Sequence, residues 1–155
     1  MHSQANYWHG MMAEAHIARS ALDSEVARLE AHILDKKFSL SALAGALLQI
    51  AKQGISVVRG RPDNCPDGRA VCGCPLKWVV WAGRNQALHF EQIRMIDDRT
   101  AHILKTMGET GGSAALTRPR AGVNLALEVV DALNWFSLEA YRDDMESLLA
   151  GEGKL

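Results

Sequence analysis

The feature that most constrains this fold is a long stretch near the N-terminus, residues 4–37, which has helical spacing of apolar residues and contains no proline. Seven apolar residues follow one another at steps of four and three, and this spacing places them along one face of a helix. They are Met11, Ala15, Ala18, Leu22, Val26, Leu29 and Ile33. Such a seam is typical of a helical bundle or a coiled coil. A helix this long also favours pairing with a second chain, so we expect a homodimer.

The remainder of the chain repeats the helical pattern in shorter pieces. The segment 38–41 interrupts the first pattern, and Ser39 or Ser41 can cap a new helix there. No stretch alternates apolar and polar residues for long, so β structure should be minor. The sequence therefore predicts an all-α fold, an antiparallel bundle of four to six helices. After the first helix, the predicted helices cover 41–58, 76–91, 92–107, 122–135 and 138–149.

We expect residues 1–155 to form a single helical domain with an irregular loop at 59–75, a segment rich in proline, glycine and other turn-forming residues. Three cysteines, Cys65, Cys72 and Cys74, lie in this loop. They could bind zinc, but their spacing is not Cys-x-x-Cys and no fourth ligand is evident, so we predict free thiols. We expect neither a metal site nor a cofactor.

Charge is distributed unevenly along the chain, although the formal net charge is only −1. Residues 51–120 carry eleven basic and six acidic groups, net +5. A local basic surface suits a ligand that carries phosphate, or it packs beside the acidic C-terminal segment. We see no signal peptide and no apolar run of the ~18 residues that would span a membrane. We therefore predict a cytoplasmic protein without membrane contact.

The chemistry of the chain concentrates in the predicted helix 76–91, where Arg84, Asn85 and His89 cluster beside Trp78 and Trp81. Asn85 and His89 are four residues apart and share one helical face, and Arg84 adjoins Asn85. Guanidinium binds phosphate through paired N–H groups, and imidazole exchanges protons near neutral pH. Asn85 can orient His89 or donate to a phosphate oxygen. These residue types suit metal-independent cleavage of a phosphodiester.

The pattern Arg84-Asn85-x-x-x-His89, which lies on a helix of a small all-α chain, resembles the motif of the HEPN (higher eukaryotes and prokaryotes nucleotide-binding) superfamily. That motif is an arginine, four to six intervening residues and a histidine, often with a polar residue after the arginine. The resemblance implies a metal-independent ribonuclease, often a toxin or a defence protein, that forms homodimers with composite clefts and can have an antitoxin partner. It also implies that Arg84, Asn85 and His89 are catalytic. Other members are inactive or only bind nucleotides.

Each of these residues also has a plain structural interpretation. Arg84 could pair with a carboxylate such as Glu91, His89 could be an ordinary helix histidine, and the two tryptophans are expected in the core. The loop arginines Arg59, Arg61 and Arg69 are candidate contacts to an RNA backbone, or they are solvated charges. The main alternative to an RNA-cleaving enzyme is a non-catalytic dimerising bundle that binds RNA or nucleotides, or serves only structure. A di-iron bundle is disfavoured because the chain has no Glu-x-x-His pair.

Overall fold

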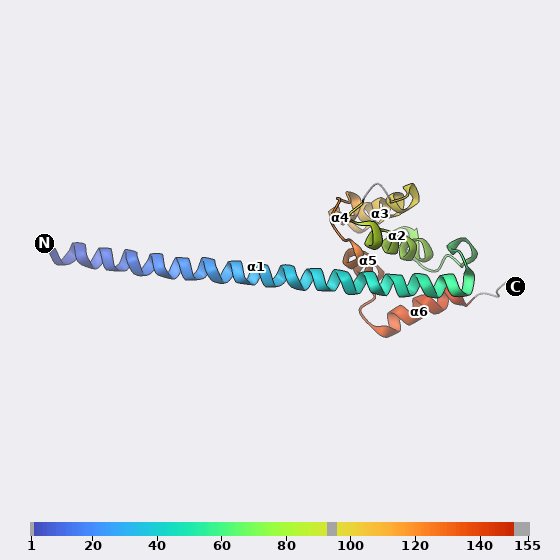
Figure 1. Ribbon diagram of the computed structural model, residues 1–155, viewed down its shortest axis with the longest axis horizontal. Helices are drawn as coiled ribbons and strands as arrows, with labels where there is room; N and C mark the ends of the chain where they lie inside the picture. The colour runs from blue at the N-terminus through green and yellow to red at the C-terminus, as the bar shows by residue number, and fades with distance from the viewer. Residues whose placement is uncertain (1, 93–95, 151–155) are drawn as a thin grey trace. The chain divides into compact units, whose positions relative to one another are not determined.

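The computed structural model describes residues 2–92 and 96–150, with the backbone alone for residues 2–8, and it is mostly helical (Figure 1). The chain divides into two compact units, residues 1–39 and 40–155. Helical content on this scale confirms the predicted all-α class. Residues 93–95, near the start of the predicted helix 92–107, lie outside the described part of the chain, as do residues 151–155.

The first helix, α1, runs from His2 to Arg59 without interruption. The predicted break at 38–41 is therefore wrong. That segment contains serine but neither proline nor glycine, and serine within a helix costs only a few tenths of a kcal/mol relative to good helix formers. Ser39 and Ser41 therefore lie within the helix and do not cap a new one. A Cβ added at Gly45, further along α1, would lie 3.5 Å from the Cβ of Ala87, an ordinary van der Waals contact, so the packing there does not require a glycine.

The predicted loop at 59–75 contains more local structure than its composition indicated. It holds a short 3₁₀ helix, η1 (Pro62–Asn64), and a two-stranded antiparallel hairpin, β1 (Ala70–Val71) and β2 (Cys74–Pro75). The turn residues Cys72 and Gly73 have φ angles of 46° and 79°. Positive φ at both central positions is the type I′ turn that matches the twist of a hairpin. These strands are the only ones in the described chain, as the lack of period-two alternation predicted.

The central helix, α2 (Leu76–His89), begins directly after Pro75, as predicted, and ends at His89. Helix α3 (Asp98–Gly111) starts later than the sequence indicated, since Asp97 caps it by accepting a hydrogen bond from the Thr100 backbone N–H. The three remaining helices are α4 (Ala114–Thr117), α5 (Ala126–Leu133) and α6 (Leu138–Leu149). Helix α4 was predicted as linker, and α5 is shorter than the predicted 122–135.

The core of the second unit forms where α1, α2 and α5 pack together. Gly83 of α2 is the point of closest approach, because an added Cβ would lie 2.7 Å from Val129 Cγ1 and 3.1 Å from Leu48 Cδ1. The α1 residues that enter this core are Ala44, Leu48, Ala51 and Ile55. The lack of a side chain at Gly83 therefore determines how closely α2 can lie to its neighbours.

A polar network joins the loop to the C-terminal helices. Arg69 donates to both carboxylate oxygens of Asp144, each at 2.7 Å, and to the Leu133 carbonyl at 2.5 Å. The Trp135 indole N–H donates to the same carboxylate at 2.8 Å. The hydrogen bonds that Arg69 donates to Asp144 raise the pKa of Arg69 above its usual value. Asp144 is only 6% exposed, and these donors satisfy its buried carboxylate oxygens.

One stretch of α1, His9–Arg59, is long and apolar enough to cross a membrane by length and composition. Gln49, Lys52 and Gln53 interrupt its apolar part, so the chain has no continuous apolar run of ~18 residues, as predicted. Core helices of soluble proteins pass the same test, and Leu48 and Ile55 within this stretch are completely buried in the core. A cytoplasmic location stays a prediction.

We expect Asp144→Ala to lower the free energy of unfolding by about 3 kcal/mol, because it leaves the Arg69 guanidinium and the Trp135 N–H without their shared acceptor. Urea denaturation measures the change. Asp143→Ala is the matched control, since Asp143 is exposed and only 3.8 Å from Arg142, and it should change stability by less than about 0.5 kcal/mol. Equal effects of the two substitutions would contradict the structural role of the network.

Candidate functional site

Arg84 lies on α2 directly after Gly83, and neutral groups hold its guanidinium. Nε donates to Gln49 Oε1 at 2.7 Å, and Nη1 lies 3.2 Å from Asn85 Oδ1. Arg84 forms no ion pair with any residue in 9–92 or 96–150. The alternative pairing with Glu91 is therefore absent from the described chain. Two of its five N–H groups are used in this way. The half-buried guanidinium therefore has N–H donors left for an anion.

Asn85 links Arg84 to the start of α3. Its oxygen accepts from Arg84, and its Nδ2 lies 3.3 Å from Asp97 Oδ2 and 3.4 Å from Thr100 Oγ1. We predicted that Asn85 would orient His89 or donate to a phosphate. In the structure it orients Arg84 instead, and its amide nitrogen faces the N-terminus of α3.

His89 is the last residue of α2, one helical turn beyond Asn85 and on the same face. It is half-buried, and its imidazole makes no hydrogen bond to any part of the chain that the structure describes. The ring nitrogens are therefore available to exchange a proton with a ligand. The structure therefore brings Arg84 and Asn85 into direct hydrogen-bonding contact. It places His89 one helical turn after Asn85 on the same helix.

Gln86, which the sequence analysis missed, fixes the segment that leads into α5. Its side chain is 1% exposed; Nε2 donates to the Val123 carbonyl at 2.7 Å, and Oε1 accepts from the Leu125 N–H at 2.8 Å. Both bonds satisfy backbone groups that precede a helix. No local sequence pattern distinguishes a buried glutamine at this position from an exposed glutamine. The sequence therefore could not identify Gln86 as a structural residue.

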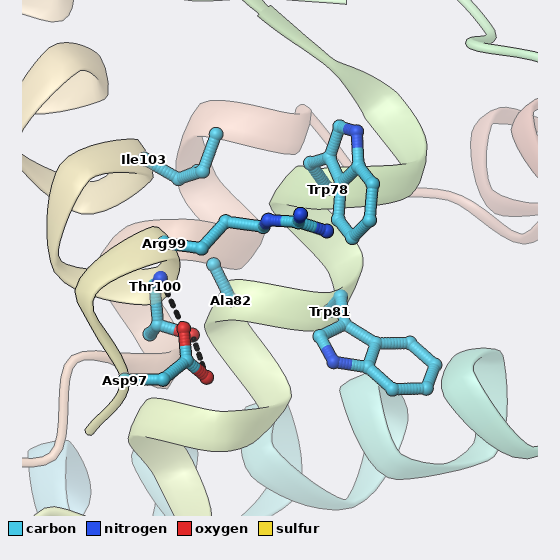
Figure 2. A pocket seen from close by; sticks show the side chains of 7 residues that line it. All are labelled: Trp78, Trp81, Ala82, Asp97, Arg99, Thr100 and Ile103. Carbon is cyan, nitrogen blue, oxygen red and sulfur yellow. Dashed lines mark hydrogen bonds between the residues drawn. The ribbon is translucent and has the colours of Figure 1, made fainter. Parts of the chain in front are cut away.

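A small cavity of about 180 Å³ lies between α2 and α3 (Figure 2). The guanidinium of Arg99 stacks over Trp78 at 4.2 Å from the ring centroid, and Lys52 lies 4.8 Å from that of Trp81. Both tryptophans are only partly buried. Trp78 packs against the core, so the core prediction holds in part for Trp78, whereas Trp81 does not belong to the described core. Asp97 and Thr100, which accept the hydrogen bonds of the Asn85 amide, also line this cavity. Its lining is Trp78, Trp81, Ala82, Asp97, Arg99, Thr100 and Ile103.

The three loop arginines have separate environments. Arg69 is committed to the ion pair with Asp144, and Arg59 donates to the Leu149 carbonyl at 2.6 Å. Arg61 is exposed. Neither Arg61 nor Arg69 forms a hydrogen bond or ion pair with Arg84, Asn85 or His89 in the described chain. The role of the three loop arginines as RNA contacts stays a prediction.

The three cysteines are free thiols, as predicted. Cys65 and Cys74 are buried, and desolvation raises the pKa of both thiols, whereas Cys72 is partly exposed at the hairpin turn. No group of three or more His, Cys, Asp or Glu side chains with metal-binding geometry occurs among the residues that the structure describes. The absence of zinc stays a prediction.

The site as a whole combines an uncompensated guanidinium, an imidazole with free nitrogens and an aromatic cavity edged by cations. Such a set can bind an anion, stack a planar group and transfer a proton. No family of known proteins, no curated protein and no solved structure matches the chain. The chemistry of the side chains is therefore the basis for any functional assignment.

We expect Gln86→Leu to lower the free energy of unfolding by about 3 kcal/mol, because the Val123 carbonyl and the Leu125 N–H lose their buried partners. Thermal and urea unfolding measure this. Gln53→Leu is the matched control, since Gln53 is exposed on α1, and its effect should be under about 0.5 kcal/mol. If the two variants are equally stable, the Gln86 bridge is unimportant.

We expect iodoacetamide to modify Cys72 before Cys65 and Cys74 in the folded protein at pH 8. Thiolate is the reactive form, and burial both blocks access to the other two sulfurs and keeps them protonated. Peptide mass mapping over time gives the order, and labelling in 6 M guanidinium is the control in which the difference should vanish. Faster labelling of Cys65 or Cys74 would contradict this arrangement.

Proposed function

We propose that this chain is a HEPN-type protein, an antiparallel helical bundle that cleaves RNA without a metal ion. One observation carries the proposal: the half-buried Arg84 is held by the neutral amides of Gln49 and Asn85, with no carboxylate partner in the described chain, one turn from an unbonded histidine. A partly buried charge without a counter-ion favours an anionic ligand. Phosphate is the anion that a planar guanidinium fits best.

The reaction proposed is attack of a ribose 2′-oxygen on the adjacent phosphorus. His89 takes the proton of the 2′-hydroxyl as the new O2′–P bond forms. The P–O5′ bond breaks, and the leaving 5′-oxygen receives a proton from water. The products are a 2′,3′-cyclic phosphate and a free 5′-hydroxyl. Arg84 stabilises the charge that gathers on the non-bridging oxygens, and this charge is largest in the transition state.

Positioning of Arg84 is the role that we assign to Asn85 and Gln49. The two amides hold Nη1 and Nε, so the remaining N–H groups have a defined direction before substrate binds. Pre-orientation of a long side chain lowers the entropy that binding would otherwise cost. The cavity at Trp78 and Trp81 lies next to this group and suits an unpaired base, since aromatic faces stack bases of any sequence.

The second candidate is a non-catalytic protein that binds single-stranded RNA or nucleotides. The cations over both tryptophans favour it, because aromatic rings interleaved with basic groups are the usual features of such sites. Binding without cleavage by the purified protein would select this candidate. A toxin or defence role with an antitoxin partner rests on the resemblance to the HEPN superfamily alone.

The test is cleavage of single-stranded RNA by the purified protein in EDTA. We expect His89→Ala to reduce the rate by about 10²–10⁴-fold, because the proton acceptor is lost. Arg84→Ala should reduce the rate by a similar factor, and Arg84→Lys should restore it only in part, since an ammonium lacks the planar fork. Products should end in a 2′,3′-cyclic phosphate, and a 2′-deoxy residue at the cut site should block cleavage.

His102→Ala is the control for His89, since His102 is exposed on α3, and Arg142→Ala is the control for Arg84. Both should cleave at the parental rate. Circular dichroism of every variant verifies the helix content. If folded His89→Ala cleaves as fast as the parent, or if the parent itself does not cleave, the enzymatic proposal is wrong.

A further inference from the structure

The N-terminal unit, residues 1–39, carries an apolar seam that nothing covers in its described part. Every described side chain from His9 to Leu40 is exposed. Leu22 is 68% exposed and Ile33 is 60% exposed. An isolated helix gains almost nothing from such residues, because helices in water depend on burial of their apolar face. A seam of this length, about 33 Å from residue 11 to residue 33, therefore implies a partner.

The spacing of the seam repeats every eleven residues. Steps of four, three and four lead from Met11 to Leu22, and the same steps lead from Leu22 to Ile33. The buried residues of α1 in the second unit, from Ala44 to Ile55, have this spacing too. There it produces a packed helix face. Eleven residues make close to three turns, so helices paired along such a seam stay nearly straight, with a slight right-handed twist.

We propose that the partner is a second copy of this chain and that the two N-terminal helices pair antiparallel, centred on Leu22. This proposal does not depend on RNA cleavage. In that register every seam residue meets another seam residue, and small residues face large ones. Complementary sizes of this kind let facing layers interdigitate. The pairs are Met11 with Ile33, Ala15 with Leu29, Ala18 with Val26, and Leu22 with Leu22 of the second copy.

The charges beside the seam agree with this orientation. Antiparallel pairing centred on Leu22 brings Arg19 beside Asp23 of the second copy, and Glu14 beside His32 of the second copy. Glu25 lies three residues from the centre of this pairing, and Arg28 already binds it at 2.6 Å within the same helix. That bond lowers the pKa of Glu25 and offsets repulsion between the two copies.

A parallel pair fits less well. Ala15 would face Ala15 and Ala18 would face Ala18, which leaves gaps beside the larger layers, and Glu25 would face Glu30 of the second copy. A lipid surface also fits poorly, because acidic and basic residues alternate around the helix between Glu14 and Lys37. A second chain in antiparallel orientation satisfies both the apolar and the charged positions.

Disulfide trapping tests the orientation in the full chain, with Cys72→Ser as the background. Ala18→Cys and Val26→Cys are prepared as separate chains. We expect a disulfide when the two chains are mixed and mildly oxidised, and almost none from either chain alone. Disulfides from each chain alone would show parallel pairing and overturn the proposal. In the antiparallel register, residue 18 lies about 12 Å along the axis from residue 18 of the second copy, too far for a disulfide, and the same holds for residue 26. Peptide mass mapping identifies the linked residues.

Sedimentation equilibrium of the full chain without the cysteine substitutions tests the seam itself. We expect a dimer at micromolar concentration, and Leu22→Asp should raise its dissociation constant at least about tenfold, because two buried leucines are lost per dimer. Ser20→Asp, on the opposite face of α1, is the matched control and should leave the constant unchanged. A monomeric parent, or equal effects of the two variants, would overturn the proposal.

Discussion

The close approach of α2 to its neighbours at Gly83 is the constraint on which the rest of the second unit depends. With no Cβ in the way, Leu48 of α1 and Val129 of α5 both reach the α2 backbone. This contact places Gln49, the residue after Leu48, within hydrogen-bonding distance of Arg84, the residue after Gly83. It also brings α5 near enough for Gln86 to bind the segment before it. A larger residue at position 83 would separate α2 from α1 and α5 and remove these polar contacts together.

The sequence predicted the all-α class, the start of α2 and the free cysteines, because apolar periodicity, a proline at a helix start and cysteine spacing are local signals. The predicted break at 38–41 is wrong, because serine favours helix caps but neither proline nor glycine is present there to end the helix. The sequence patterns also missed the start of α3, where Asp97 caps the helix, and the short hairpin, whose turn has a cysteine at positive φ in place of the expected asparagine or glycine.

The candidate site was predictable only in part. The proximity of Arg84 and Asn85 follows from their adjacency, whereas Gln49 is 35 residues away and Thr100 is 15 away, so no local pattern could identify them as partners. Arg69 illustrates the opposite case. Its loop position indicated a solvated charge or an RNA contact, but Asp144, 75 residues further on, holds it in a paired network. Long-range polar contacts depend on the packing of whole helices, which single-sequence patterns do not determine.

The way in which Arg84 is held has a consequence for how the site responds to acidity. Amide side chains do not titrate, so the two groups that hold the guanidinium, Gln49 and Asn85, contribute the same contacts at any pH at which the protein is folded. An arginine bound to a carboxylate would instead lose or gain a competitor for its ligand as that carboxylate took up or released a proton. Of the side-chain types in the motif, imidazole is the one that exchanges protons near neutral pH. Any sensitivity of anion affinity to acidity in that range therefore reports on the imidazole, and the cation supplies a constant background.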